Sequence, residues 1–169
     1  NFKSFSDNSN TVTVALAGNP NVGKSTLFNN ITGMNQHTGN WPGKTVSNAV
    51  GYCKYKNVNY TFVDIPGTYS LISHSPEEEI ARDFLIKEKP DITVVVCEAI
   101  SLKRNLNLVL QILEITKNVI VCINLIDEAE KRGFKVNAKL LENKLGVPVI
   151  TLKSGPAGVF GDEFSGSME

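Results

Sequence analysis

Two patterns of apolar residues alternate along this chain. Short continuous apolar runs are typical of buried strands, and longer segments with an apolar residue every three or four positions are typical of helices that pack on a sheet. This alternation predicts the α/β class, with a mostly parallel sheet and helices on both faces. The apolar runs predict strands over Val12–Ala17, Val46–Tyr55, Val58–Asp64, Ile92–Cys97, Val119–Asn124 and Val147–Thr151. The amphipathic segments predict helices over Ser25–Thr32, Pro76–Lys87, Leu102–Thr116, Asp127–Arg132 and Asn137–Leu145.

Three connections carry signals of their own. Only Lys56-Asn57 separates the second and third strands, so these strands should form an antiparallel hairpin. Ser75 can cap the helix that follows it, with Pro76 in the first turn and Glu78 completing a capping box. The segment from Met34 to Thr45 contains glycines and a proline and is expected to be a loop, and loops of that length often have a function.

Composition places the chain among ordinary single-domain proteins. Its 169 residues suffice for one domain with a sizeable core, which we assign to residues 11–152. Residues 1–10 are expected to be a disordered or vector-derived tail, and residues 153–169 an irregular tail that resembles a tag. Net charge is zero with both signs interspersed, which argues against a nucleic-acid partner. The apolar runs are too short to span a bilayer, so the fragment alone is expected to be soluble.

A phosphate-binding P-loop motif is present in the run Gly18-Asn19-Pro20-Asn21-Val22-Gly23-Lys24-Ser25. It lies between a predicted strand and a predicted helix, which is the context that the motif requires. Gly18 and Gly23 let the backbone approach an anion, which then faces the N–H groups at the start of the helix. Lys24 supplies a positive charge for the β- and γ-phosphates, and the Ser25 hydroxyl can bind Mg²⁺. The nucleotide-binding set also includes Thr26, the next residue of the helix.

Two further motifs follow later strands. After the third strand comes Asp64-Ile65-Pro66-Gly67, in which Asp64 can hold Mg²⁺ and the Gly67 N–H can bind a γ-phosphate. After the fifth strand comes Asn124-Leu125-Ile126-Asp127, an N-x-x-D pattern that suits guanine. The Asp127 carboxylate can accept hydrogen bonds from N1–H and the exocyclic amine of guanine, whereas adenine offers no such pair of donors. Together with the P-loop, these motifs predict a site for GTP or GDP.

The predicted loop after the P-loop helix offers a switch. Thr45 can close over Mg²⁺ and the γ-phosphate when GTP is bound, with Thr38 as the competing candidate. Trp41, the single tryptophan, is expected to anchor this loop by burying its ring. The loop would then be ordered by the triphosphate and released after hydrolysis.

Hydrolysis is expected to be slow or assisted by another cation. Thr68 stands where Ras-type GTPases carry a water-positioning glutamine, and threonine cannot orient an attacking water in the same way. Arg82 and Arg104 are interpreted as charges on helix surfaces, so neither is expected to act as an arginine finger. The candidate catalytic residues are therefore Lys24, Thr45 and Gly67, to which the resemblance described next adds Asn21.

With these residues in place, the chain resembles the N-terminal G domain of the FeoB ferrous iron transporters over residues 12–149. The most specific shared motif is the loop Gly39-Asn40-Trp41-Pro42-Gly43. Further shared motifs are Gly67-Thr68-Tyr69-Ser70-Leu71, Ser75-Pro76-Glu77-Glu78-Glu79, Arg104-Asn105-Leu106 and Asn124-Leu125-Ile126-Asp127. The resemblance implies a P-loop, Ras-like G domain with a six-stranded sheet.

The resemblance also assigns roles to residues. It implies that Thr45 is the switch I threonine and Asp64 the switch II aspartate, which bind Mg²⁺ together with Ser25. It implies that Asn124 and Asp127 bind guanine, with Leu125 in place of the lysine of the common N-K-x-D form. Asn21 falls where potassium-activated GTPases carry a cation-ligating asparagine. A K⁺ ion held there would partly replace an arginine finger.

The resemblance finally implies a larger protein. FeoB proteins continue into a helical regulatory domain and a membrane permease, at the cytoplasmic face of the cell membrane, and the parent transporter offers a route to oligomers. The implied function is GTP binding and slow hydrolysis that regulates or drives Fe²⁺ uptake. One departure is that Thr151-Leu152-Lys153-Ser154 stands where an S-A-x loop would contact guanine. The alternatives are a nucleotide sensor without useful turnover, a potassium-dependent GTPase of RNA modification or ribosome assembly, and a P-loop ATPase.

Overall fold

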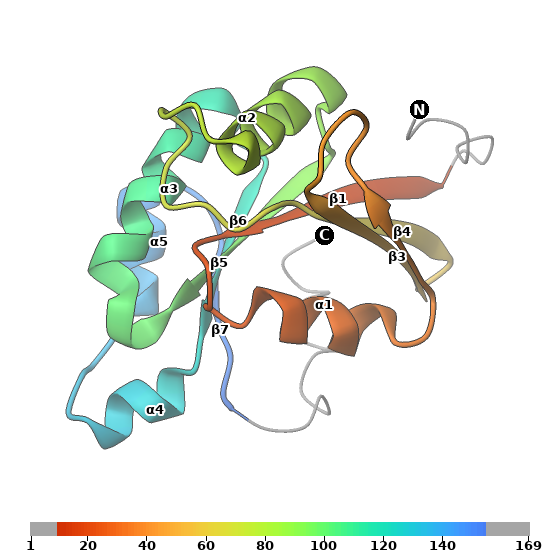
Figure 1. The fold of residues 1–169 in the computed structure, drawn as a ribbon. Coiled ribbons are helices and arrows are strands. Elements are labelled where there is room, and N and C mark those ends of the chain that lie inside the picture. The colour runs from red at the N-terminus through yellow and green to blue at the C-terminus, as the bar shows by residue number, and fades with distance from the viewer. Residues whose placement is uncertain (1–9, 155–169) are drawn as a thin grey trace.

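The computed structural model describes residues 10–154, and in this part of the chain one twisted sheet is the centre of the fold (Figure 1). Seven strands follow the order β2-β3-β4-β1-β5-β6-β7. β3 runs antiparallel to β2 and β4, and the other neighbouring strands are parallel. The strands are β1 (Thr11–Gly18), β2 (Gln36–Asn40), β3 (Ser47–Tyr55), β4 (Val58–Asp64), β5 (Ile92–Glu98), β6 (Val119–Asn124) and β7 (Val149–Thr151).

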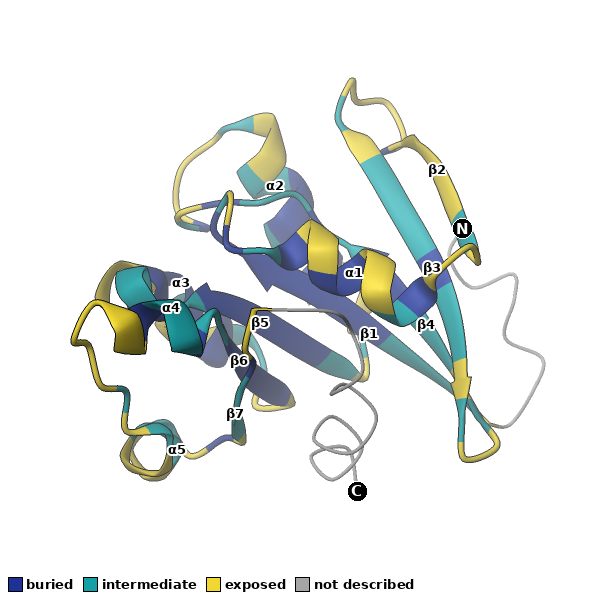
Figure 2. Ribbon diagram, turned by 90° about the horizontal axis from the view of Figure 1, so that it is seen from below, coloured by how far each residue is buried: buried dark blue, intermediate teal, exposed yellow. Residues whose placement is uncertain are grey.

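Helices lie on both faces of the sheet, as predicted (Figures 1 and 2). α1 packs on one face, where its side chains join those of β1, β4 and β5. α2, the π-helical segment η2 and α3 pack on the other face, and α5 lies beside β7. The helices are α1 (Lys24–Thr32), α2 (Pro76–Asp83), η2 (Phe84–Glu88), the short 3-10 helix η3 (Ala99–Ser101), α3 (Leu102–Ile115), α4 (Ile126–Lys131) and α5 (Ala138–Leu145).

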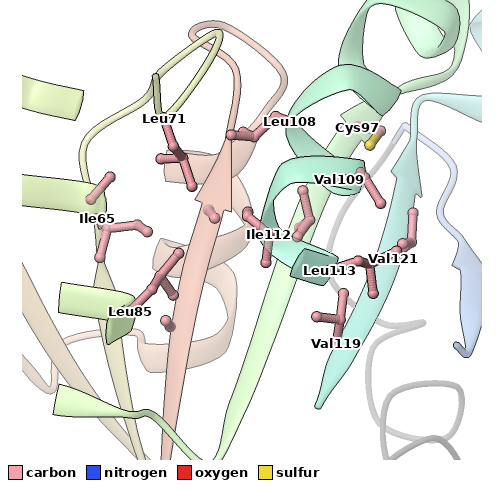
Figure 3. Close-up of a cluster of buried hydrophobic side chains, with 14 of the residues drawn as sticks. Ile65, Leu71, Leu85, Cys97, Leu108, Val109, Ile112, Leu113, Val119 and Val121 are labelled. Carbon is pink, nitrogen blue, oxygen red and sulfur yellow. The ribbon is translucent and has the colours of Figure 1, made fainter. Parts of the chain in front are cut away.

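The larger apolar cluster fills the space between the sheet and the α2–α3 layer. Figure 3 shows Val109 and Leu113 of α3 beside Val119 and Val121 of β6, in the same cluster as Ile112. Ile112 and Val109 are fully buried, as are the central strands in Figure 2. A second cluster lies under α1, so the sheet is apolar on both faces, which explains why its central strands read as continuous apolar runs.

The strand β2 corrects the prediction of a loop from Met34 to Thr45 and of a six-stranded sheet. Gln36–Asn40 pairs antiparallel with β3, from Gln36 opposite Gly51 to Asn40 opposite Ser47. Its residues are mostly exposed and polar, so it has no alternation of apolar and polar positions to mark it as a strand. Backbone hydrogen bonds to β3 hold this edge strand in place.

The helix after Ser75 differs from its prediction in two details. Ser75 does cap it, since its hydroxyl accepts a hydrogen bond from Glu78 N at 3.2 Å. The expected capping box is absent because the Glu78 carboxylate accepts instead from Ser73 N, at 2.8 Å. The α-helical part ends at Asp83, and the predicted remainder is the wider π-helical turn η2.

Candidate nucleotide-binding site

The P-loop lies at the carboxyl end of β1, between that strand and α1 (Figure 1). Two of its residues have left-handed backbones, Asn21 with a φ of 63° and Gly23 with a φ of 88°. Glycine is also required at position 23 for space, because a Cβ there would collide with the Asn124 amide. Gly18, Asn19 and Val22 are buried, Pro20 is half-buried, and Asn21, Ser25 and Thr26 are exposed.

The P-loop lysine is paired with the predicted magnesium aspartate. Lys24 Nζ contacts Asp64 Oδ1, and the two side chains are only 10% and 19% exposed. α1 positions Lys24 at its first residue, and Asp64 is the last residue of β4, a neighbour of β1 in the sheet. The pair places a positive charge and a carboxylate together at the helix N-terminus, where phosphate and Mg²⁺ are expected.

The segment after Asp64 packs directly on the P-loop. Thr68 N donates to Gly18 O at 3.1 Å, and Thr68 is buried. A Cβ on Gly67 would lie 3.2 Å from Pro20 Cα, so a larger residue would press against the loop backbone. The Gly67 amide is therefore beside the P-loop, at the place where a bound γ-phosphate is expected.

The guanine motif is bonded to the same loop. Asn124 Nδ2 donates to Val22 O at 3.2 Å, and Asn124 Oδ1 accepts from Leu125 N at 2.9 Å. Leu125 has a left-handed backbone, with a φ of 58°, at the turn into α4. Asn124 therefore links the N-x-x-D turn to the phosphate loop and sets their relative position.

Ser154 holds the Asp127 carboxylate and was not among the predicted site residues. Ser154 Oγ donates to Asp127 Oδ2, and Ser154 N donates to Asp127 Oδ1 at 2.8 Å. These two hydrogen bonds, the side-chain bond first, lower the pKa of Asp127 below its ordinary value. The segment after β7 thus contacts the predicted guanine-binding aspartate, although its residues do not match S-A-x.

The structure does not bring Thr45 to these residues. Thr45 is exposed in the turn that connects β2 and β3, and this hairpin rises away from α1 in both views (Figures 1 and 2). Thr38, the competing candidate, lies in β2 opposite Ala49 and is also exposed.

Trp41 anchors the hairpin, as predicted. Only 6% of its surface is exposed, and its ring packs edge-on against Phe84 of η2 with centroids 5.6 Å apart. Trp41 N also donates to Val46 O at 2.9 Å, which closes the base of the turn.

A second pair of contacts holds the segment that follows Gly67. Gln111 Oε1 of α3 accepts from Leu71 N at 2.7 Å, and Arg82 Nη1 of α2 donates to Leu71 O at 2.9 Å. The Leu71 side chain is buried in the core beside α3 (Figure 3). Arg82 is thus a clamp on a loop, which corrects its interpretation as a surface charge. Arg104 lies over the ring of Tyr69, with its guanidinium carbon 5.5 Å from the centroid.

The oxygen donors at the P-loop fit a magnesium ion. Ser25 and Asp64 offer a hydroxyl and a carboxylate, the hard ligands that Mg²⁺ prefers, beside the helix start where phosphates would complete its shell. Among residues 10–154, no three His, Cys, Asp or Glu side chains cluster so as to hold a metal by themselves. In the same range, no helix has the length and apolar character needed to cross a bilayer.

Comparisons with known sequences agree on one family. A family model described as ferrous iron transport protein B matches residues 12–157. The Fe(2+) transporter FeoB of Escherichia coli strain K12 is 42% identical over 147 residues, which make up 85% of this chain and 19% of that protein. The chain therefore spans about a fifth of the length of this curated relative.

Solved structures agree with the same relationship. The G domain of the T. maritima FeoB iron transporter matches with a TM-score of 0.82 and 41% identity, covering 92% of this chain and 93% of that one. The cytosolic domain of the same transporter in a GDP form matches with a TM-score of 0.81 and 44% identity, covering 87% and 58%.

Proposed function

The chain belongs to the family of ferrous iron transport protein B, and from this membership we propose that it binds GTP and hydrolyses it slowly to GDP and phosphate. The observation that carries the proposal is the meeting of three motifs at one edge of the sheet. Lys24 of the P-loop contacts Asp64, and Asn124 of the guanine motif bonds to Val22 of the same loop. The GDP forms of the T. maritima relative support a guanine nucleotide at this place.

Base recognition in this proposal rests on Asp127. Its ionised carboxylate accepts from N1–H and the exocyclic amine of guanine, and adenine offers that acceptor no such pair of donors. The two hydrogen bonds from Ser154 keep the carboxylate ionised and oriented. Asn124 holds the turn against the P-loop, so the distance between base and phosphate pockets is fixed before the nucleotide arrives.

Phosphate binding requires the Lys24–Asp64 pair to open. Lys24 turns to the β- and γ-phosphates, and Asp64 becomes available to Mg²⁺ together with Ser25 and, after movement of its loop, Thr45. When bound, Mg²⁺ neutralises charge on the phosphate oxygens. Water then attacks the γ-phosphorus in line with the leaving GDP oxygen, while Lys24 and the Gly67 amide stabilise the charge that develops.

Potassium is the proposed substitute for an arginine finger. Asn21 is exposed in the P-loop and has a left-handed backbone. Its amide oxygen is a suitable ligand for K⁺ beside the β- and γ-phosphates. Arg82 is occupied with Leu71 O and Ser73 O, so its role in the loop argues against a catalytic one.

A nucleotide sensor without useful turnover is the second candidate function. Thr68 favours it, because this residue is buried with its amide bonded to Gly18 O, and its short side chain cannot orient an attacking water as a glutamine does. The family membership sets aside the alternative of a GTPase that acts in RNA modification or ribosome assembly.

In the whole protein, we propose that nucleotide state in this domain regulates or drives Fe²⁺ uptake. The relatives that suggest this role are about five times longer than the chain, so the proposed partners are a helical domain and a membrane permease outside it. The domain would then work at the cytoplasmic face of the membrane.

Phosphate release from GTP and from ATP tests the enzymatic proposal. We expect release from GTP with Mg²⁺, far less from ATP, and none from either with Lys24→Ala. Lys131→Ala is the matched control, since Lys131 lies on α4 and pairs only with Glu128 on the surface. Equal rates with ATP, or full activity in Lys24→Ala, would overturn the proposal.

A further inference from the structure

We propose that Phe84 is a positioning residue for Thr45. Its contact with Trp41 acts as a latch that holds the β2–β3 turn away from the nucleotide site, and GTP must release this latch before Thr45 can join the site. The inference rests on the proposed function, because it takes Thr45 as the residue that closes over GTP. It adds a defined contact, far from the phosphate pocket, that decides how readily the closed state forms.

The turn that carries Thr45 is closed on itself. Trp41 N donates to Val46 O, and Lys44 N donates to Trp41 O, both at 2.9 Å. The first bond continues the β2–β3 ladder beyond the Asn40–Ser47 pair, and the second closes the turn between the two strands. Thr45 therefore lies inside a six-residue turn whose base is Trp41, and it cannot travel alone without opening that base.

The register of the sheet shows how far Thr45 has to move. Ala49 of β3 lies directly opposite Asp64 of β4. β3 begins at Ser47, and Thr45 lies two residues before it in the bent turn, so Thr45 is up to roughly 13 Å from Asp64 along the strand direction at about 3.3 Å per residue. A threonine that binds the same Mg²⁺ needs its hydroxyl at about 2.1 Å from the ion. Closure therefore requires the turn between β2 and β3 to move toward Asp64, and hydrogen bonds join this turn to its base at Trp41.

The base of this turn is fastened to the α2 layer. The Trp41 ring is buried against Phe84, with centroids 5.6 Å apart and an interplanar angle of 74°. Lys44 Nζ and Glu79 Oε2 form an ion pair at 3.3 Å on the surface beside the rings. The ring contact is the main fastening, since half-exposed ion pairs of this kind contribute little.

The latch has a thermodynamic consequence for nucleotide preference. GDP has no γ-phosphate to attract Thr45, so it binds while Trp41 and Phe84 remain in contact. The free energy of GTP binding includes the cost of breaking that contact. Weakening the ring contact therefore raises the affinity for a GTP analogue while leaving that for GDP nearly unchanged.

The single tryptophan makes the latch directly observable. We would record Trp41 emission in the wild-type chain with Mg²⁺ and either GDP or β,γ-imido-GTP, with binding measured separately by calorimetry. Release of the buried ring into water predicts a red shift with the analogue and none with GDP. If the analogue binds, and Thr45→Ala weakens that binding, yet Trp41 emission stays at its free-state maximum, the latch is excluded.

Phe84→Leu tests the role of the contact. It should shift Trp41 emission to the red before any ligand is added, and raise the ratio of analogue to GDP affinity by about threefold or more. Phe62→Leu is the matched control, because Phe62 is equally buried but lies in the cluster under α1. Equal changes of the ratio in both variants would reduce the effect to lost stability and overturn the proposal. If neither nucleotide binds to the wild type, the proposed function itself fails, and the latch with it.

Discussion

At the scale of single residues, the Asp127 carboxylate shows how one interaction prepares the site. The backbone N–H and the hydroxyl of Ser154 each donate to one of its two oxygens, and Ser154 lies 27 positions away in sequence. An acceptor that is already ionised and oriented loses little freedom when guanine binds. Ser154 is therefore expected to contribute to nucleotide affinity although its side chain reaches the base only through Asp127.

Ser154→Ala should weaken GDP binding several-fold at neutral pH. The pKa of Asp127 lies below its ordinary value of 3.8, so its ionised form stabilises the fold above that value, and this contribution is lost as the pH falls through the lowered pKa. Removing the Ser154 hydroxyl raises the pKa, so the acid loss of GDP binding should begin at a higher pH in the variant. Calorimetric titrations at decreasing pH measure this shift. If GDP affinity falls over the same acidic pH range in the variant and the wild type, Ser154 does not control the charge of Asp127.

For residues in motifs of fixed local spacing, the place in the fold could be predicted from the sequence alone. The P-loop, Asp64, Gly67 and Asn124 are brought to one edge of the sheet, because the strands that carry them end together there. Ser154 could not be found in this way. Its role depends on where the short strand β7 ends relative to Asp127, and no local pattern records that.

At the scale of elements, α2 and α3 hold the segment after Gly67 through backbone groups. Leu71 is bonded at its N–H by Gln111 and at its carbonyl by Arg82, and its side chain is buried. A loop fastened on both sides of one residue can transmit a change at the P-loop to the two helices. The available signal in the sequence was the polar Gln111 on a half-buried helix position.

Gln111→Ala should destabilise the domain by about 1–3 kcal/mol, since it leaves the buried Leu71 N–H without an acceptor. Hydrogen exchange should increase most at residues 70–73, because Ser70 also contacts Gln111. Denaturant unfolding and exchange measurements test both statements. Asn107→Ala, at an exposed position of the same helix, is the control and should alter neither. Uniform exchange across the domain would contradict a local clamp.

Elements with strong periodicity were predicted well, and the misses have physical causes. The strand Val58–Asp64 and the strand Val119–Asn124 were predicted to the residue. The second is a buried apolar run, and the first lies between a two-residue hairpin turn and the Asp64 motif. The edge strand β2 was missed because its stability comes from backbone pairing with β3. The change from α-helix to π-helix begins at Phe84, whose ring contacts Trp41 more than forty positions away, and no local pattern marks it.

At the scale of the whole molecule, we expect nucleotide binding and folding to be coupled. The site draws on β1, β4, β6 and β7, so it exists only when the sheet is complete. A ligand that binds the native state alone stabilises it in proportion to its concentration. The α/β topology that makes this possible followed from the alternation of runs. Of the tails expected over residues 1–10 and 153–169, residues 1–9 and 155–169 lie outside the described residues.

Saturating GDP should raise the thermal midpoint. At a hundred times its dissociation constant, a ligand adds about 2.7 kcal/mol, which corresponds to roughly 5–11 °C for a domain of this size. Differential scanning fluorimetry measures the shift. Asp127→Ala should lose most of it, while Asp83→Ala should retain it, because Asp83 pairs only with Lys87 on the surface of α2. Equal shifts in both variants would place GDP elsewhere.

The most direct test of the account is single-turnover hydrolysis of GTP by this domain in KCl and in NaCl, with Asn21→Ala alongside the wild type. The account predicts that K⁺ accelerates hydrolysis several-fold over Na⁺, and that Asn21→Ala loses this response while still binding GDP. If GTP binds but neither salt supports turnover, the domain is a nucleotide sensor, and the proposed GTPase activity is contradicted.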